Sequence, residues 1–335
     1  MLACAAAYGS QVFRFNDQDY VPIADWARAD KLNCQWIKRG DLFETTGPGT
    51  KLVFDVDSHY ADINGVQVAL SFPIANQKGV ALIAQFDLDH TVRPLLFPSR
   101  YLQPGPIKTI CLDPGHGGRD SGNRVRWHAE KTYTLLLAFD VRDELEKAGF
   151  KVILTRTKDT YVDLPARPAF ANKYNADLFV SLHFNATPTG KDAVEGPQTY
   201  CITPVGASST DAQGEGSNHG LAPANRDENN SLLLAYQVQE SLVQTLHLDD
   251  RGVRRARYAV LRDARMPAIL IESGYMTNPA EGKKIYTSAY RHALARAIAN
   301  GIVTYQKLTS PPPPPPITDM HRKPATKRPS AKHSP

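Results

Sequence analysis

The sequence of 335 residues predicts an α/β fold with a mostly parallel sheet, preceded by a smaller β-rich region. Three observations carry this prediction. After about residue 107, short apolar runs alternate with longer segments of helical periodicity, the pattern of a parallel sheet flanked by helices. Residues 177–182 are nearly continuous in apolar side chains, as a central parallel strand should be. Before residue 98, short alternating runs and Asn64-Gly65, a strong hairpin signal, indicate β structure.

Composition excludes several classes of protein. The chain is 42% hydrophobic and 22% charged, which fits a globular protein. No apolar run approaches the roughly 20 residues that a transmembrane helix needs, so no transmembrane segment is predicted. The net charge of +5 is concentrated in the tail, whose charged residues are Asp319, Arg322, Lys323, Lys327, Arg328 and Lys332. The rest of the chain is nearly neutral, so we predict no nucleic-acid partner.

Both ends of the chain have a distinct composition. Residues 1–10 resemble the small-residue end of a secretory signal, and we interpret them as a signal remnant. Residues 311–316 are six prolines, which favour an extended spacer. We therefore predict a Pro-rich, basic, disordered tail over 309–335, with an electrostatic tether to an anionic polymer or lipid surface as the functional alternative to a merely solvated tail.

Residues 11–97 are predicted to form a β-rich N-terminal module. Alternating runs follow one another, with a single helix expected over 20–32. The carboxylates and histidines of this region are scattered, so no catalytic group is expected in it. The pattern loosely resembles the N-terminal module of copper amine oxidases and of many cell-envelope proteins, which implies packing or binding to the envelope or wall. Residues 98–106, rich in proline, are predicted to be a linker.

The second region alternates strands and helices in order. We predict strands over 109–112, 151–155, 177–182, 199–203, 258–261 and 268–271, and helices over 130–147, 166–174, 232–246 and 289–305. Residues 205–230 are too long and too rich in Gly, Ser and Asn for an ordinary connection. They are a candidate lid or regulatory loop.

The turn over 113–118 presents a histidine at the end of the first of these strands. Asp113 and Pro114 are expected to stop the strand, because proline lacks the N–H that a central strand donates. Glycines on both sides of His116 let the backbone turn sharply and leave the corner free of side chains for a ligand to approach. Open α/β sheets bind their ligands at this end of the strands.

Three more polar residues are expected where a strand ends or a helix begins. Glu130 opens the first helix, His183 ends the third strand and Glu272 ends the last strand. Because the carboxyl ends of parallel strands share one edge, these side chains can converge with His116. Two imidazoles and a carboxylate form a catalytic zinc set, and a second carboxylate beside it can act as general base and then acid.

Each of these residues also has a purely structural interpretation. Glu130 could be a favourable acidic residue at a helix N-terminus. His183 could be a core histidine bonded to backbone. Glu272 could pair with a nearby arginine, the candidates being Arg254, Arg255, Arg257 and Arg262.

The motifs as a set are more specific than their members. The segments 112–118, 130–131, 155–156, 176–186 and 271–278 resemble, in the same order, the zinc-dependent N-acetylmuramoyl-L-alanine amidases that trim bacterial cell wall. The resemblance covers about residues 107–308 and implies a single α/β domain with a twisted six-stranded sheet. It also implies one Zn²⁺ on His116, Glu130 and His183, with Glu272 as the catalytic glutamate. Asn185, or a backbone N–H, is a weaker candidate for binding substrate.

The resemblance implies hydrolysis of the amide bond between the lactyl group of N-acetylmuramic acid and L-alanine in peptidoglycan. We therefore expect a monomeric protein in the periplasm or outside the cell, with an activator protein that acts on loop 205–230 as a further partner. One alternative is a catalytically silent wall-binding or activating protein, which would be expected to lose one of the four site residues. Another is a zinc carboxypeptidase, in which the first two ligands lie three residues apart, unlike His116 and Glu130.

Overall fold

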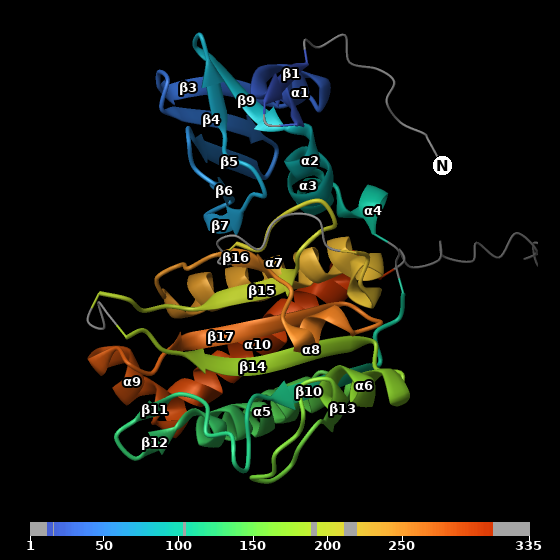
Figure 1. Ribbon diagram of the computed structural model, residues 1–335, viewed down its shortest axis with the longest axis vertical. Coiled ribbons are helices and arrows are strands. Elements are labelled where there is room, and N and C mark those ends of the chain that lie inside the picture. The colour runs from blue at the N-terminus through green and yellow to red at the C-terminus, as the bar shows by residue number, and fades with distance from the viewer. Residues whose placement is uncertain (1–11, 16, 103–104, 189–192, 211–219, 311–335) are drawn as a thin grey trace, which may run out of the picture.

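The computed structural model describes residues 12–15, 17–102, 105–188, 193–210 and 220–310. The predicted signal remnant and the tail beyond residue 310 lie outside these residues. A β-rich N-terminal part sits against one side of a larger part in which helices flank a sheet (Figure 1). Within the described ranges, no helix combines the length and the apolar character needed to cross a membrane.

Six strands form the sheet of the larger part. They lie in the order β13 (Lys151–Leu154), β10 (Thr109–Pro114), β14 (Leu178–Asn185), β17 (Ala268–Tyr275), β15 (Gln198–Ile202) and β16 (Val253–Ala256). All neighbours are parallel except β15 and β17, which run antiparallel. We call the edge at which β10, β14 and β17 end the carboxyl edge, and the edge at which they begin the amino edge. The chain therefore has an α/β fold.

The sheet continues beyond these six strands, so the prediction of a six-stranded sheet was incomplete. Val253 of β16 pairs with Val68, which joins a five-stranded antiparallel sheet to the edge of the larger part and makes one sheet of eleven strands. The added strands are β7 (Val66–Ala69), β6 (Tyr60–Ile63), β5 (Thr50–Asp55), β4 (Leu42–Gly47) and β3 (Asn33–Lys38). A second sheet comprises β1 (Phe13–Phe15), β2 (Gln18–Pro22), β9 (Val80–Ala84) and β8 (Ala75–Gln77).

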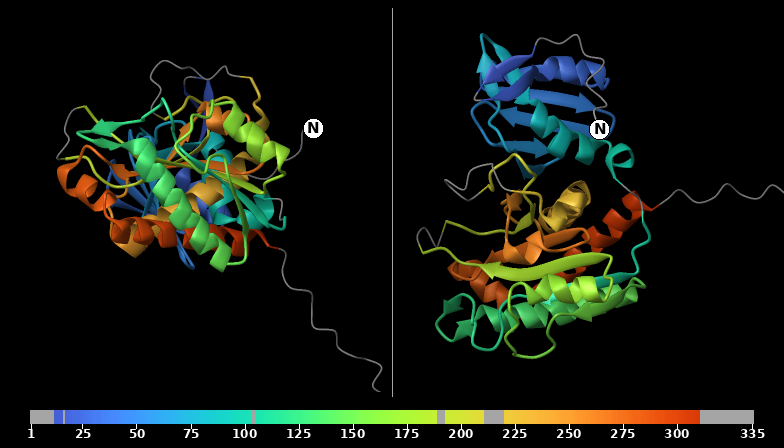
Figure 2. Two further views of the ribbon diagram at one scale, coloured as in Figure 1. Left: turned by 90° about the horizontal axis from the view of Figure 1, so that it is seen from below. Right: turned by 45° about the vertical axis from the view of Figure 1, so that its right-hand side comes forward.

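Helices cover both faces of the larger part's sheet (Figure 2). The long helices α5 (Glu130–Lys147), α7 (Glu228–Leu246) and α10 (Ser288–Thr309) pack together in the larger hydrophobic cluster, on the face that holds Ile110 and Leu112. The shorter helices α6 (Ala166–Lys173) and α8 (Ala259–Arg262) pack on the face that holds Cys111. Alternate residues of one strand thus enter two cores, which explains why the central strands are apolar throughout.

Short helices make up most of the connection between the two parts. They are α2 (Gln85–Asp87), the π-helical turn η1 (Leu88–Val92), α3 (Arg93–Leu96) and α4 (Pro98–Tyr101). The predicted linker therefore begins with a helical turn at Pro98. The remaining elements are α1 (Ile23–Ala29), the hairpin β11 (Arg124–Val125) and β12 (His128–Ala129), the 3-10 helix η2 (Pro223–Asp227) and α9 (Pro279–Ile285).

Three local predictions were wrong. The helix expected over 20–32 is confined to α1, because Gln18–Pro22 forms β2. Residues 258–261 are not a strand: α8 begins at Ala259, and the strand is β16. Strand β10 continues through Pro114, which pairs with Leu182 of β14. A proline is tolerated there because its nitrogen faces the side of β13, and β13 has already ended at Leu154.

Candidate active site

Three of the predicted residues converge at the carboxyl edge. His116 lies on the turn after β10, Glu130 is the first residue of α5, and His183 lies near the end of β14. Glu130 Oε1 is 3.1 Å from His116 Nε2 and 3.0 Å from His183 Nδ1. One ligand atom from each residue lies within 4.8 Å of the others. Glu130 is 14 positions from His116 and 53 positions from His183 along the chain, and the fold brings the three residues together.

The charges of this group are strongly coupled. Burial by itself would raise the pKa of Glu130, but hydrogen bonds and charge from His116 and His183 outweigh it and hold that pKa well below its usual range. Burial would lower the pKa of His116, but Glu130 and Asp120 outweigh it and raise that pKa. The buried carboxylate is therefore ionised and faces two imidazole nitrogens, an arrangement that favours a cation among them.

The turn that carries His116 is held by two buried arginines. Arg156 donates hydrogen bonds to the carbonyls of Pro114 and Gly115, and Arg167 donates to those of Pro114 and His116. Arg167 also forms a buried ion pair with Asp113 at 2.9 Å. These contacts stabilise a backbone with a φ of 62° at His116, a left-handed conformation that a residue with a β-carbon adopts at a cost of about 1 kcal/mol or more.

Glycines close to His116, Glu130 and His183 allow other parts of the chain to pack tightly against this turn. They do not leave open space for a ligand. A Cβ at Gly115 would lie 2.2 Å from His183 Cε1. A Cβ at Gly122 would lie 2.5 Å from His116 Cδ2 and 2.6 Å from Glu130 Oε2. A Cβ at Gly117 or Gly118 would meet the backbone of residues 160–161. The expectation that these glycines keep the corner free for substrate was wrong, because neighbouring parts of the same chain fill that space.

Two side chains that orient the group were not predicted from the sequence. Asp120 Oδ2 lies 2.9 Å from His116 Nδ1, on the side of the ring away from Glu130. Asn123 donates to Glu130 Oε2 through both its backbone N–H and its side-chain amide, each at 2.9 Å. A carboxylate behind a metal-binding histidine fixes the ring and raises its basicity. Their closeness to His116 and Glu130 in the sequence was the available signal.

Glu272 lies beside the group, on the neighbouring strand. It is in register with His183, from β17 to β14. The residue as a whole is half-buried, but its Oε2 is buried and has no hydrogen-bond partner among the described residues. Burial of the carboxyl group raises its pKa to about 7, and the charge of Glu130 adds to that shift. The alternative pairing with an arginine finds no support at Arg255, which donates to carbonyls at Ile202 and His90.

Asn185 ends β14, the strand that carries His183, and is in register with Tyr275 of β17. Its side chain is half-buried, and its Oδ1 accepts a hydrogen bond of 2.7 Å from the backbone N–H of Ala186. The described contacts therefore give Asn185 a local structural role and leave its role toward a substrate as a prediction.

Glu281 braces the end of the strand that carries Glu272. Its carboxyl group accepts hydrogen bonds from the backbone N–H of Tyr275 at 2.7 Å and of Gly196 at 3.1 Å. Burial raises the pKa of Glu281 to about 7, despite these two donors. Gly274 is required here because a Cβ would lie 2.6 Å from Glu281 Oε1.

The donor set fits a catalytic Zn²⁺. Two imidazole nitrogens and one carboxylate oxygen are a known set for this ion, which keeps a further position for water or substrate. The unpartnered Oε2 of Glu272 supplies a second acceptor at the same edge. These observations show a group that could hold a metal ion, formed by His116, Glu130 and His183.

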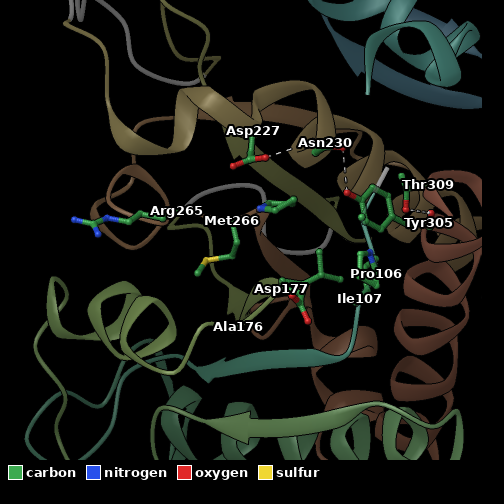
Figure 3. A pocket seen from close by; sticks show the side chains of 13 residues that line it. Pro106, Ile107, Ala176, Asp177, Asp227, Asn230, Arg265, Met266, Tyr305 and Thr309 are labelled. Atoms are coloured by element: carbon green, nitrogen blue, oxygen red, sulfur yellow. Dashed lines mark hydrogen bonds between the residues drawn. The ribbon is translucent and has the colours of Figure 1, made fainter. Parts of the chain in front are cut away.

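A cavity of about 270 Å³ lies at the other end of the strands (Figure 3). It is lined by the segments that precede β10, β14 and β17, among them Asp177 and Met266. Asn230, on α7, donates to Asp227 and accepts from the hydroxyl of Tyr305 across its wall. None of the four site residues predicted from the sequence lines this cavity.

The described parts of loop 205–230 also lie at the amino edge. Because β15 runs antiparallel to β17, residues that follow Ile202 emerge at the end opposite Glu272. The backbone N–H of Thr210 donates to the carbonyl of Arg255 there, and the backbone N–H of Arg255 donates to the Thr210 hydroxyl. Gly206 lies against Phe86 of α2. The described residues therefore contradict the interpretation of this loop as a lid over the metal-binding group. Residues 211–219, including His219, lie outside the described residues.

The fold and the site define a class of protein: an α/β enzyme with a candidate metal site at the carboxyl edge of its sheet. Residues 110–304 match the family profile of N-acetylmuramoyl-L-alanine amidases. The chain belongs to this family and is a hydrolase of the amidase type, which acts on cell wall.

Similar proteins support this assignment. The chain is 34% identical over 224 residues to the amidase AmiA of Salmonella typhimurium, covering 60% of this chain and 77% of that protein. An amidase structure from Clostridium difficile 630 covers 61% of this chain and 98% of its own, with a TM-score of 0.51 and 32% identity. The CwlD amidase of Clostridioides difficile, solved in complex with the GerS lipoprotein, covers 60% and 99%, with a TM-score of 0.50 and 29% identity.

Proposed function

We propose that the enzyme is zinc-dependent and cleaves the amide bond between the lactyl group of N-acetylmuramic acid and L-alanine in peptidoglycan. The observation that carries this proposal is the convergence of His116, Glu130 and His183, each of which places one ligand atom within 4.8 Å of those of the other two. These three residues would hold the ion. The separate carboxylate of Glu272, in register with His183, distinguishes the site from a purely structural metal site.

Bound Zn²⁺ supplies a Lewis acid for the lactyl carbonyl and lowers the pKa of the attacking water. Glu272 takes the proton of that water and delivers it to the departing nitrogen of L-alanine. Asp120 keeps the His116 ring oriented and its far nitrogen hydrogen-bonded. Asn123 performs the corresponding task for Glu130. Asn185, or a backbone N–H nearby, is proposed to bind the substrate carbonyl as its charge develops.

We further propose a division of labour along the chain. Residues 107–308 form the catalytic domain, 98–106 the linker, and 11–97 a wall-binding module. The basic tail over 309–335 is proposed as an electrostatic tether. The enzyme would act in the periplasm or outside the cell, as a monomer, in wall remodelling such as daughter-cell separation or lysis.

An activator protein is proposed as a further partner. The relative CwlD is known in complex with a lipoprotein, which supports the idea that such enzymes take protein partners. In this chain the activator would act on loop 205–230. Since the described parts of that loop lie at the amino edge, its effect on the metal site would be transmitted through the sheet.

The test is mass spectrometry of fragments released from purified sacculi, with and without a zinc chelator. We expect free stem peptides with new L-alanine N-termini, lost on chelation and restored by added Zn²⁺. Release of fragments cut elsewhere in the polymer would contradict the assigned bond. Equal release in the chelator would contradict the dependence on zinc. A catalytically silent wall-binding protein would release nothing in either condition.

A further inference from the structure

The hairpin of β11 and β12 presents an exposed tryptophan beside the metal-binding group. Trp127 stands at its tip with 75% of its surface exposed. It precedes Glu130 by three residues, which span at most about 10 Å of extended chain. The same loop contacts the group through Asn123 and Gly122. An indole of this size exposed at a catalytic edge marks a contact surface rather than a core residue.

The hairpin that carries Trp127 is held in place by contacts of the neighbouring His128. The ring of His128 stacks on Tyr286 with 3.6 Å between centroids, and its Nδ1 is hydrogen-bonded to the hydroxyl of Tyr133 on α5. Val125 and His128 pair across a two-residue turn. Arg126, the first residue of that turn, has a φ of 55°, in the left-handed region. These contacts fix the hairpin and leave most of the Trp127 surface exposed, with Arg126 and His128 as the neighbours of its ring.

We propose that Trp127 is a stacking platform for a sugar ring of the glycan strand that adjoins the cleaved muramoyl residue. This inference rests on the proposed function, because it takes the polymer at the site to be peptidoglycan. The C–H groups on one face of a pyranose carry partial positive charge, and the face of an indole carries partial negative charge, so the two stack without needing an ionic partner.

The glycan is favoured over the stem peptide by the chemistry of the tip. Recognition of a peptide's carboxylates would be carried by guanidinium groups, such as those of Arg119 and Arg126 in the same stretch of chain. Arg119 lies over Tyr161 with 4.1 Å from its Cζ to the ring centroid, and Arg126 lies 6.0 Å from the centroid of Trp127. The large uncharged face of Trp127 contributes little to binding a carboxylate. A neutral ring is the better match for it.

The experiment compares two variants of the full-length protein, Trp127→Ala and Trp127→Phe. Tyr174→Ala is the matched control, because Tyr174 is also exposed, at 53%, but lies just before β14 at the amino edge. Two readouts are used. One is equilibrium binding of peptide-free glycan strands, which requires no catalysis. The other is kcat and KM on sacculi and on a soluble muramoyl peptide with a single sugar.

We expect Trp127→Ala to weaken strand binding about tenfold, equivalent to about 1.4 kcal/mol, with Trp127→Phe intermediate and Tyr174→Ala unchanged. On sacculi, Trp127→Ala should raise KM with little change in kcat, while both constants on the single-sugar substrate stay within about twofold. The proposal is overturned if wild-type protein does not bind the strands, if Trp127→Ala binds them equally well, or if both substrates are affected alike. An enzyme that binds strands through Trp127 but cuts no amide would refute the proposed function alone.

Discussion

The two edges of one sheet differ in what their polar groups do. At the carboxyl edge, His116, Glu130 and His183 turn their polar atoms toward one another. At the amino edge, a cavity of about 270 Å³ is lined by carboxylates that serve the fold. Asp177, for example, accepts hydrogen bonds from the backbone N–H groups of Lys108 and Thr109. This cavity is at one edge and the convergent donor set is at the other.

This difference shows that the volume of a cavity is a weaker guide to a catalytic site than the hydrogen bonding of the polar atoms at each edge. Within the described part of the chain, the buried Oε2 of Glu272 has no hydrogen-bond partner. The carboxyl group lies close enough to His183, Glu130 and His116 for their charges to shift its pKa. An acceptor left unpaired in a protein interior costs about 1–3 kcal/mol, so its retention calls for a reason. A role in proton transfer supplies one. The following changes test the contrast between the edges, beginning with the largest expected effect.

Replacing Glu272, the proposed catalytic glutamate, should have the largest effect. Glu272→Gln keeps the shape of the side chain but cannot accept the proton of the water. We expect kcat on sacculi to fall about 10²- to 10⁴-fold, while zinc content measured by atomic absorption stays the same. The matched change at the amino edge, Asp227→Asn, should leave kcat within about twofold. Comparable losses in the two variants would abolish the distinction between the edges.

Removing the buried brace of the His116 turn should unfold the protein more readily. Arg167→Met leaves Asp113 as a buried carboxylate without its ion-pair partner. The free energy of unfolding in urea should fall by about 3–5 kcal/mol. Arg265→Met, which removes an exposed arginine at the amino edge, should change it by less than about 0.5 kcal/mol. An unchanged urea midpoint for Arg167→Met would show that the turn does not depend on this pair.

Loss of the carboxylate behind His116 should act on the metal rather than on the fold. Asp120→Asn removes the negative charge that faces His116 Nδ1. Zinc affinity, measured by competition with a chromogenic chelator, should fall about 10- to 100-fold. The urea midpoint of the metal-free protein serves as the check on folding. Asp143→Asn, on the outer surface of α5, is the control, and an equal loss of affinity there would argue for a general effect of charge.

A smaller effect is the dependence of the free energy of unfolding on pH through Glu281. Its pKa is raised to about 7 in the folded protein from a usual 4.5, so the folded state binds its proton more tightly than the unfolded state. Its stabilising contribution is thus complete below about pH 4.5 and is lost as the pH rises through 7, by at most about 3 kcal/mol.

Unfolding free energies of wild type and Glu281→Gln, measured at about pH 5 and pH 8, test this effect. The variant lacks the titrating group, so its stability relative to wild type should improve as the pH rises. Burial also raises the pKa of Asp87, to about 6, but that group is common to both proteins and cancels in the difference. A constant difference between the two proteins would contradict the raised pKa of Glu281.

The sequence by itself determined much of the larger part. Helix α5 begins at Glu130 and ends at Lys147 as predicted, because its apolar period and the glycine after it are local signals. The convergence of His116, Glu130 and His183 could also be predicted from the sequence. Each stands where a strand ends or a helix begins, and parallel strands bring such ends to one edge.

Only the tertiary structure decided which edge each loop occupies and how the site is supported. Because β15 runs antiparallel to β17, the described parts of loop 205–230 lie at the edge opposite Glu272. No local sequence pattern predicts the direction in which a strand runs. The hydrogen bonds by which Arg156 and Arg167 hold the His116 turn join residues 41 and 51 positions apart. Propensity acts between neighbours in the chain, whereas these contacts exist only once the chain has folded.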